Sequence, residues 1–442
     1  MSEHLGSDAV SQRPVPVRGR TMRRRVGVAL VVGTLLSGVA ACADESSSTT
    51  PDDTDTTVSA TDVADLLGPD DLASGEPVRI GLLTEGVSAT VDASDEIPAG
   101  QATVEWLNQH RGGIGGRPVE LVTCEMHADP AGAADCANRM VQEDVVAVTL
   151  PQSAYAEAIW QPLHDAGIPL LFSAASGENL EHDAQSTFIM INPTAAFFAL
   201  PVSLANTLDV DKVDFVVIDV PQAVDVVNKD GAATMGKADL DYDVVPIPLG
   251  TPDMVPQMQH VKDGGAGVVH ILGNDSFCIA AIQSLKAVGY TGAISGVSQC
   301  FTDATRAALG AELEGISVLA PLADGATDDP GYQLYLAVME EYGTGIKEVD
   351  GYYALGGYAA VATLAATLET IDGEITAATA AETIRSMPET ELPAGGGVTI
   401  KCGGSAMPAK PAICTNQYLR AELDAEGNPT NYTVEDATEL VG

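Results

Sequence analysis

The residues best suited to chemistry in this sequence are short polar groups that directly follow apolar, β-rich runs. Ligands of open α/β sheets bind beyond the carboxyl ends of the strands. That rule nominates six loops, at residues 84–89, 152–155, 173–176, 219–223, 274–277 and 298–301. A hydroxyl or amide at a helix start, together with the backbone N–H groups there, suits an anion or a small polar group.

Motifs for bond-breaking chemistry are weak by comparison. Residues 231–238 (GAATMGKA) come close to a phosphate-binding loop, but they lack the Ser or Thr that holds Mg²⁺ and fall inside or after a helix. The sequence has no G-x-S-x-G and no H-E-x-x-H motif. His127 and Asp129 stand beside a helix start, where capping or solvation explains them. We therefore predict no enzyme, no cofactor and no metal site.

Six cysteines remain when Cys42, discussed below, is set aside. An even number in an oxidising compartment favours disulfides. A zinc site is the alternative, but no two cysteines have metal-ligand spacing and the seven histidines are scattered. Sequence neighbours are the most plausible partners, which predicts the bridges Cys124–Cys136, Cys278–Cys300 and Cys402–Cys414.

The N-terminal segment carries an export signal. Arg23, Arg24 and Arg25 precede the apolar run 26–41, which ends in small residues before Cys42. This pattern predicts a lipoprotein signal peptide at 1–41 and lipidation of Cys42. An ordinary secretory signal with a chance cysteine and an uncleaved anchor are the alternatives, although the run is shorter than the roughly 20 residues of a spanning helix.

The chain has a formal net charge of −41. Nucleic-acid binding depends on basic residues that neutralise phosphates, so this charge argues against nucleic acid as a partner. It argues equally against a polybasic contact with anionic lipid. It agrees with a solvated protein outside the cytoplasm, attached to the cell membrane through its lipid anchor.

Residues 42–76 are predicted to be a flexible acidic tether rich in Ser and Thr, with one possible helical turn at 63–67. Their apolar surface is too small to offset the entropy of ordering. From residue 77 onwards, strand-like runs alternate with helical periods, and at residue 193 the alternation restarts. The first unit has strands expected at 78–83, 119–122, 145–148 and 168–172, and the second has them at 213–218, 244–247, 268–272, 293–294 and 316–319. Fully apolar strands alternating with helices are typical of doubly wound parallel sheets.

Several short patches resemble one known family. The segment 107–122 (LNQHRGGIGGRPVELV) is similar to a helix stop and tight turn into a strand in the branched-chain amino acid binding proteins of ABC transporters. Asp129-Pro130 resembles the family's helix start, in which Asp caps and Pro occupies the first turn. Residues 166–176 resemble its strand and binding loop, and residues 287–290 a strand approach in the second lobe. The likeness extends over residues 77–434, nearly all of the predicted mature chain.

The resemblance implies a periplasmic binding protein type I fold. Two doubly wound, Rossmann-like α/β lobes would be joined by a hinge with three crossings, and the ligand would bind in the interlobe cleft. Lobe 1 is expected at 77–193 plus 322–388 and lobe 2 at 194–321 plus 389–442. The partners it implies are a small-molecule ligand and the permease and ATPase subunits of an ABC importer, with the binding protein itself a monomer.

The resemblance also assigns the binding loops. In the family, an amino acid carboxylate is held in lobe 1 by a helix start and by the loop after the next strand, and an aromatic residue of a late helix lines the pocket. The candidate ligand-binding residues are Gln152, Ser153, Ala154, Tyr155, Ala175, Ser176, Asp219, Gln222, Asn274, Asp275, Ser298 and Tyr353.

The second lobe departs from the family pattern. Members that bind an α-ammonium usually have an acid where Ser298 stands and tyrosines in place of Asn274 and Ala223. The ligand is therefore left open among an amino acid, an amide or urea-like compound, and a carboxylate. A ligand-sensing receptor subunit that signals to a membrane partner is the alternative function, and an exported enzyme on the same fold is a third.

Overall fold

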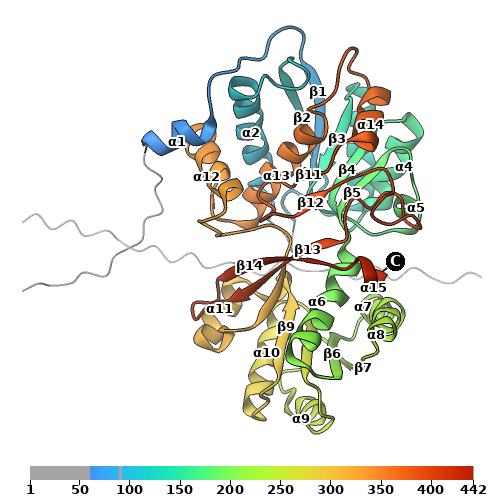
Figure 1. Cartoon of the computed structure of the whole chain (residues 1–442), viewed down its shortest axis with the longest axis vertical. Helices are drawn as coiled ribbons and strands as arrows, with labels where there is room; N and C mark the ends of the chain where they lie inside the picture. The colour runs from blue at the N-terminus through green and yellow to red at the C-terminus, as the bar shows by residue number, and fades with distance from the viewer. Residues whose placement is uncertain (1–59, 89–91, 442) are drawn as a thin grey trace, which may run out of the picture. The chain divides into compact units, whose positions relative to one another are not determined.

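The computed structural model describes residues 60–88 and 92–441. This part of the chain forms two sheets of mainly parallel strands, each covered by helices on both faces (Figure 1). The predicted α/β fold class is therefore confirmed. The predicted signal peptide and Cys42 lie outside the described residues.

The first sheet has the strand order β2-β1-β3-β4-β5, and all of its pairs are parallel. Its strands are β1 (Val78–Thr84), β2 (Val119–Glu125), β3 (Ala147–Leu150), β4 (Leu170–Ala174) and β5 (Thr187–Ile191). Neighbouring side chains of β1 enter different cores. Leu82 packs with α2 and α13, while Leu83 packs with α3 and α4. The strands are therefore apolar on both faces, as a buried parallel sheet requires.

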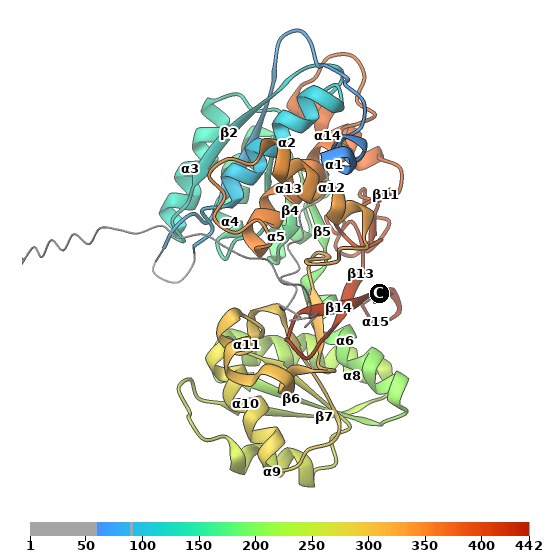
Figure 2. The same cartoon turned by 90° about the vertical axis from the view of Figure 1, so that its left-hand side faces the viewer.

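Helices of the first lobe come from two distant parts of the sequence. They are α1 (Ala60–Leu67), α2 (Glu96–His110), α3 (Pro130–Gln142), α4 (Ala156–Ala166), α5 (Glu178–Glu181), α12 (Pro330–Tyr342), α13 (Tyr352–Thr367) and α14 (Ala377–Ser386). Helices α2 and α13 lie side by side in both views (Figures 1 and 2). A Cβ on Gly357 would lie 2.2 Å from the carbonyl oxygen of Glu96, so glycine is required for this close approach.

The second sheet has the order β14-β13-β10-β9-β8-β6-β7. Its strands are β6 (Lys212–Ile218), β7 (Asp241–Ile247), β8 (Val268–Leu272), β9 (Ala293–Val297), β10 (Ser317–Ala320), β13 (Gln417–Leu423) and β14 (Pro429–Asp436). The first five in sequence are parallel and repeat the order of the first sheet, with β6 in the place of β1. β13 and β14 extend this sheet in the antiparallel sense.

The second sheet is likewise covered on both faces. Its helical segments are α6 (Pro193–Leu208), α7 (Pro221–Val226), the π-helical turn η1 (Val227–Gly231), α8 (Ala232–Ala238), α9 (Val255–Asp263), α10 (Asp275–Ala287), the 3₁₀ turns η2 (Ser298–Cys300) and η3 (Gly310–Leu313), α11 (Asp303–Leu309) and α15 (Thr438–Val441). Helices α6 and α8 pack on one face, and α9 and α10 pack on the other.

The chain passes between the lobes three times: after β5, after β10 and before β13. Asn192, in the first crossing, donates through Nδ2 to Oδ1 of Asn416 in the third, at 3.2 Å. In the second crossing, the backbone carbonyl of Asp324 accepts a hydrogen bond from the Tyr432 hydroxyl of β14. The first contact joins two crossings to each other, and the second fastens the remaining crossing to β14.

Residues 389–414 pack against a different lobe from the rest of the C-terminal segment. They include the two-stranded sheet of β11 (Thr390–Glu391) and β12 (Thr399–Ile400). Ile413 forms a parallel bridge with Ile189 of β5, and Lys410 pairs with Glu181 at 2.8 Å. This segment therefore contacts the first lobe, whereas β13 and β14 belong to the second sheet.

Local sequence signals explain several helix ends. Oδ2 of Asp129 accepts from the N–H of Gly132 at 2.9 Å, and Pro130 occupies the first turn of α3, as predicted. Gly113 has φ +68, and a Cβ there would lie 2.0 Å from the Arg117 carbonyl oxygen. The predicted tight turn after α2 therefore depends on glycine.

The structure contains disulfides between Cys124 and Cys136, Cys278 and Cys300, and Cys402 and Cys414. They close sequence separations of 12, 22 and 12 residues. Each joins sequence neighbours, the pairing expected from the sequence.

Part of the predicted tether is ordered, so the expected flexibility was wrong for residues 60–76, whereas the helical turn expected at 63–67 is confirmed as part of α1. Helix α1 buries Val63 and Leu67, which are four residues apart and therefore share one helix face. Nε1 of Trp106 donates to the Leu67 carbonyl at 3.1 Å. Two apolar side chains and one hydrogen bond are enough to dock a single short helix, which composition averaged over the segment concealed.

The short helices α5, α11 and α15 were absent from the prediction, and so were two longer elements. One is β5, and the other is α6, which contains Pro201 in its interior. No helix within 60–88 and 92–441 is long and apolar enough to cross a membrane.

Candidate functional site

The loop after β3 holds the first group of predicted residues. Oγ of Ser153 accepts the N–H of Tyr155 at 3.0 Å, so Ser153 orders the turn that leads into α4. Gln152 and Ala154 are exposed, and Tyr155 is partly buried against the core. Ser153 thus has the structural role of a turn residue, and its neighbours leave polar surface at the strand end.

The loop after β4 lies beside the loop after β3. The N–H of Ala174 donates to the Pro151 carbonyl at 3.2 Å, which ties the two strand ends together. Ala175 is buried and Ser176 is exposed. The structure therefore brings residues 152–155 and 175–176 to one edge of the first sheet, as predicted.

Tyr353 lies in the first turn of α13, close to these loops. A Cβ on Gly356, one turn further along, would lie 3.6 Å from Cβ of Pro151, so α13 passes directly beside the end of β3. The ring of Tyr353 is partly buried and stands 5.4 Å from the ring of Tyr352, at 74°. Burial raises the pKa of Tyr353, and the carboxylates of Glu96, Asp92 and Glu85 raise it further.

In the second lobe, Asp219 directly follows β6 and is exposed. Its N–H donates to the Ile247 carbonyl at 2.8 Å, which fastens it to the end of β7. Gln222 belongs to α7, and its side chain lies outside the described residues.

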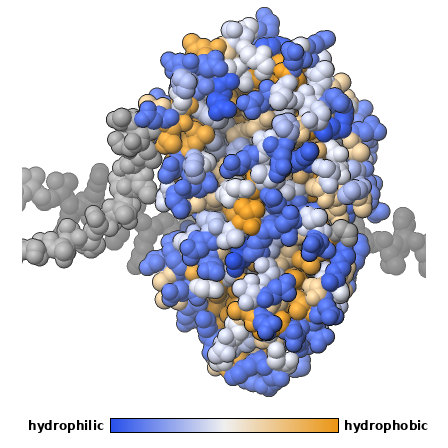
Figure 3. Space-filling view, in the orientation of Figure 1, coloured by the Kyte–Doolittle hydropathy of each residue, from blue (hydrophilic) through white to orange (hydrophobic). Residues whose placement is uncertain are grey.

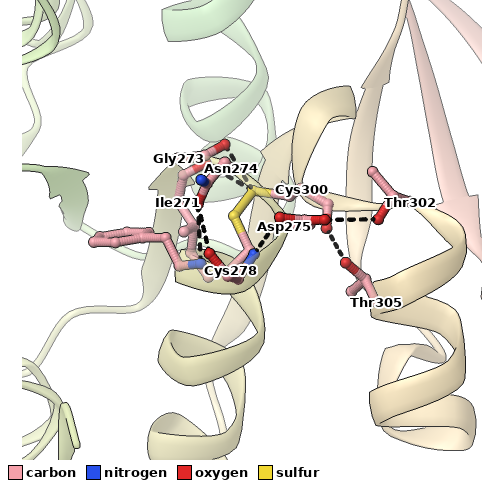
Figure 4. Close-up of a disulfide and its surroundings, with 10 residues drawn as sticks. Ile271, Gly273, Asn274, Asp275, Cys278, Cys300, Thr302 and Thr305 are labelled. Atoms are coloured by element: carbon pink, nitrogen blue, oxygen red, sulfur yellow. Dashed lines mark hydrogen bonds between the residues drawn. A yellow bond between two sulfur atoms is a disulfide. The ribbon is translucent and has the colours of Figure 1, made fainter. Parts of the chain in front are cut away.

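Asn274 and Asp275 lie beside the Cys278–Cys300 disulfide (Figure 4). Oδ1 of Asn274 accepts the N–H of Phe277 at 3.1 Å and so caps α10. Oδ2 of Asp275 accepts from Oγ1 of Thr302 at 3.4 Å, and Ser298 begins η2. The disulfide therefore joins the first turn of α10 to η2, the turn after β9 that Ser298 begins.

The strand order explains why these loops meet. In the first sheet, β1, β3 and β4 are neighbours, and in the second sheet β6, β8 and β9 are neighbours. The connections reverse direction between β1 and β3, and again between β6 and β8. Such topological switch points leave a crevice beyond the carboxyl ends of the strands. The predicted residues follow β3 and β4 in one lobe and β6, β8 and β9 in the other.

Two acidic residues at the first switch point were missed. Glu85 follows β1, in a loop that the strand-end rule nominated, and Glu96 begins α2. Burial raises the pKa of Glu96 well above its ordinary value, and the nearby Glu85 carboxylate raises it further. The position of Glu85 after an apolar strand was a usable signal, but no sequence pattern marked Glu96.

No group of three or more His, Cys, Asp or Glu side chains suited to a metal ion occurs within residues 60–88 and 92–441. The site consists instead of capped helix starts, hydroxyl and amide groups, carboxylates and two tyrosine rings. Such an arrangement can recognise a small molecule through hydrogen bonds and charge.

A comparison with protein-family models matches residues 77–411 to the family described as "Periplasmic binding protein". The chain belongs to this family. Solute binding, rather than catalysis, is the activity of periplasmic binding proteins. Members that serve ABC importers work outside the cytoplasm. No curated protein sequence matches this periplasmic binding protein.

Solved structures share the fold of this periplasmic binding protein at low sequence identity. A putative branched-chain amino acid ABC transporter protein from Rhodospirillum rubrum is 16% identical, has a TM-score of 0.66, and is matched over 81% of this chain and 100% of its own. The branched-chain amino acid transporter substrate binding protein of Streptococcus pneumoniae, solved with isoleucine, is 15% identical and has a TM-score of 0.61. It is matched over 82% of this chain and 100% of its own.

A third similar structure is a fatty acid ABC transporter substrate-binding protein from Thermomonospora curvata. It is 16% identical, with a TM-score of 0.60, and is matched over 84% of this chain and 93% of its own. Together these neighbours confirm the predicted type I periplasmic binding protein fold. Their names specify different substrates, branched-chain amino acids in two cases and fatty acid in the third, so the fold does not select a ligand.

Proposed function

We propose that this protein is an extracytoplasmic, lipid-anchored solute-binding protein of an ABC importer. It captures a small polar organic solute, an amino acid or an amide- or carboxylate-like compound, and passes it on to permease and ATPase subunits. The observation that supports this most directly is the placement of polar loops at the switch points of both lobes, in a chain that belongs to the periplasmic binding protein family.

The mechanism is recognition by closure of two lobes, expected from the sequence at 77–193 plus 322–388 and at 194–321 plus 389–442, except that residues 389–414 pack on the first lobe and move with it. A monomer of this kind needs no other copy to complete its site. The loops of lobe 1 hold the ligand first, and those of lobe 2 close over it, with Tyr353 and Tyr155 shielding it from water. The ligand binds more tightly to the closed state than to the open one, and that difference shifts the population toward closure.

Calorimetric titration of residues 60–442 tests the proposal. The panel contains leucine, isoleucine, valine, basic and acidic amino acids, small amides and small carboxylates. We expect at least one panel member to bind and to reduce the radius of gyration in solution scattering. If the whole panel fails to bind, the proposal is wrong.

The substitution Ser176→Tyr tests where the ligand binds. Ser176 is exposed beside the ends of β3 and β4, so a tyrosine ring there fills the ligand space without disturbing the core. We expect binding of a verified ligand to fall at least tenfold while the melting temperature is kept. Ser74→Tyr is the matched control, because Ser74 is exposed and precedes β1 at the opposite edge of the same sheet. Equal affinity in the two variants would remove the 175–176 loop from the site.

Lipid anchoring is tested separately by mass spectrometry of the protein exported by its native host. The expected N-terminal residue is Cys42 carrying an acyl-modified sulfur. An unmodified N-terminal peptide that includes or precedes Cys42 would reject the anchor while leaving solute binding intact.

A further inference from the structure

Two carboxylates at the first switch point are buried without hydrogen bonds. Both side-chain oxygens of Glu85 and Oε2 of Glu96 are inaccessible to solvent and accept no hydrogen bond within the described residues. Glu96 is only 3% exposed. A buried ionised carboxylate without a partner is costly, and native proteins retain such groups mainly where function requires them.

The two carboxylates belong to one group. The charge of Glu85 acts on Glu96, and both act on the hydroxyl of Tyr353. Tyr352 is influenced by Glu96 as well. The geometry agrees, because Gly357 of α13 packs directly against the backbone of Glu96, which places the start of α13, with both tyrosines, beside the start of α2.

The nearby ammonium group of Lys347 binds other residues and not Glu85 or Glu96. Nζ of Lys347 lies 3.0 Å from Oδ2 of Asp92 and 2.8 Å from Oγ of Ser94. Asp95 accepts the backbone N–H groups of Lys347 and Glu348, at 3.0 and 3.1 Å. The neighbouring aspartates are thus satisfied by the segment before α13, while Glu85 and Glu96 are not.

A buried carboxylate elsewhere in the same lobe shows the usual arrangement. Asp183 is 7% exposed and accepts hydrogen bonds from Ser186 Oγ at 2.6 Å, Thr187 Oγ1 at 2.8 Å and Trp160 Nε1 at 3.1 Å. Burial alone would raise the pKa of Asp183, but these hydrogen bonds outweigh it and lower the pKa. Glu85 and Glu96 lack comparable donors, so their three unpartnered oxygens remain available to the donor groups of a ligand.

We propose that Glu85, Glu96 and the ring of Tyr353 form a subsite for a protonated amine or guanidinium group of the solute. This inference rests on the proposed solute-binding function and narrows the solute to an organic cation. An ammonium offers three N–H donors and a guanidinium five, enough to satisfy the three unpartnered oxygens. Tyrosine rings beside carboxylates add cation–π attraction. A cation would remove the repulsion between the two carboxylates on binding.

The surrounding charge favours the same class of solute. The sequence carries 62 acidic and 21 basic residues, and the face shown in Figure 3 is mostly hydrophilic. A negative field raises the local concentration of small cations and speeds their association. A carboxylate on the solute could still bind at the N–H groups and hydroxyls of residues 153–155 and 176, so amino acids with basic side chains fit both parts of the site.

The test compares amino acids that have a positively charged side chain with amino acids of similar shape that have an uncharged side chain; all of them carry the same α-ammonium and α-carboxylate groups, so the comparison isolates the side-chain charge. L-arginine is compared with L-citrulline and L-lysine with L-norleucine, and putrescine represents an amine without a carboxylate. Calorimetric titrations use residues 60–442 in a buffer that contains EDTA, so that metal ions do not contribute to binding. The proposal expects at least one cationic probe to bind at least tenfold more tightly than its neutral counterpart.

Single substitutions test whether Glu85 and Glu96 bind the cationic group. Glu85→Gln and Glu96→Gln keep the side-chain shape and remove the charge, and each is expected to weaken binding of the cationic probe at least tenfold. Glu105→Gln is the matched control, because Glu105 is exposed on the same helix, roughly 13 Å along its axis from Glu96. Melting temperatures show whether each variant is folded.

Each result has one meaning. Binding of a neutral panel member together with failure of every cationic probe overturns the subsite and leaves the proposed function in place. Cation binding that is unchanged in Glu85→Gln and Glu96→Gln also overturns the subsite. Failure of every compound in both panels rejects the subsite and the proposed function together.

Discussion

The substitution Asp324→Asn is expected to stabilise the protein at neutral and alkaline pH. Asp324 follows β10 in the second crossing between the lobes and is partly buried. Burial raises its pKa to about 6; the nearby Asp350 raises it further, and Arg306 opposes the rise. The ordinary value is 3.8, so the ionised form is disfavoured in the native state.

The magnitude follows from linkage. Because the native-state pKa is raised, the free energy of unfolding is highest below the unfolded-state pKa and falls as the pH rises towards 6. Above pH 7 the full penalty applies, about 3 kcal/mol at 1.36 kcal/mol per pH unit. At pH 4 it is only about 0.5 kcal/mol, since the native carboxyl is protonated and the unfolded one is about half ionised.

Urea unfolding followed by circular dichroism measures this difference. With a slope of about 3 kcal/mol per M, the Asp324→Asn midpoint should rise by about 1 M at pH 8 and by far less at pH 4. Asp328→Asn, at an exposed position in the same loop, is the matched control and should change neither midpoint. An Asp324→Asn midpoint at or below the native one at pH 8 would refute the reasoning, and so would an equal gain at both pH values.

Two further perturbations test the same structure. Glu96→Gln should raise the melting temperature of the ligand-free protein more at pH 8 than at pH 4.5. Burial raises the pKa of Glu96, so the native protein loses stability as the pH rises, whereas the variant does not. A native protein more stable than the variant at pH 8 would contradict this. Replacing both Cys278 and Cys300 with alanine removes a disulfide that closes a sequence separation of 22 residues, and it should lower the free energy of unfolding by about 3 kcal/mol. Urea unfolding without reductant measures this loss. An unchanged midpoint would show that the disulfide does not constrain the unfolded chain.

Helix caps, turns and disulfide partners were predictable because they depend on neighbours in sequence. Asp129 caps α3 three residues away, and Gly113 supplies the backbone conformation that its own turn needs. The bridges of 12 and 22 residues likewise join short separations.

Elements without a clear period were not predictable in the same way. β5 is buried along its whole length, and α6 is apolar on most sides and contains Pro201. A strand buried on both faces and a helix buried all round lose the alternation that distinguishes one from the other. The docking of α1 was missed for a different reason, since it depends on Trp106, which is 39 residues from Leu67.

The candidate site shows the same division. The strand-end rule alone located the loops at 152–155, 175–176 and 274–275, because parallel strands place their carboxyl ends at one edge. The sequence left open whether Ser153 caps its helix start or binds a ligand, and the structure shows Oγ of Ser153 accepting the N–H of Tyr155. The capping of α10 by Oδ1 of Asn274 became visible only in the structure.

The sequence by itself determined the alternation of strands and helices, the acidic character, the pairing of cysteines and the polar loops that follow the strands. Only the tertiary structure decided which charges are satisfied. Lys347 reaches Asp92 across 255 residues, and Glu85 and Glu96 are left without donors. Whether a buried carboxylate has a partner depends on contacts between distant segments, and local sequence patterns do not encode such contacts.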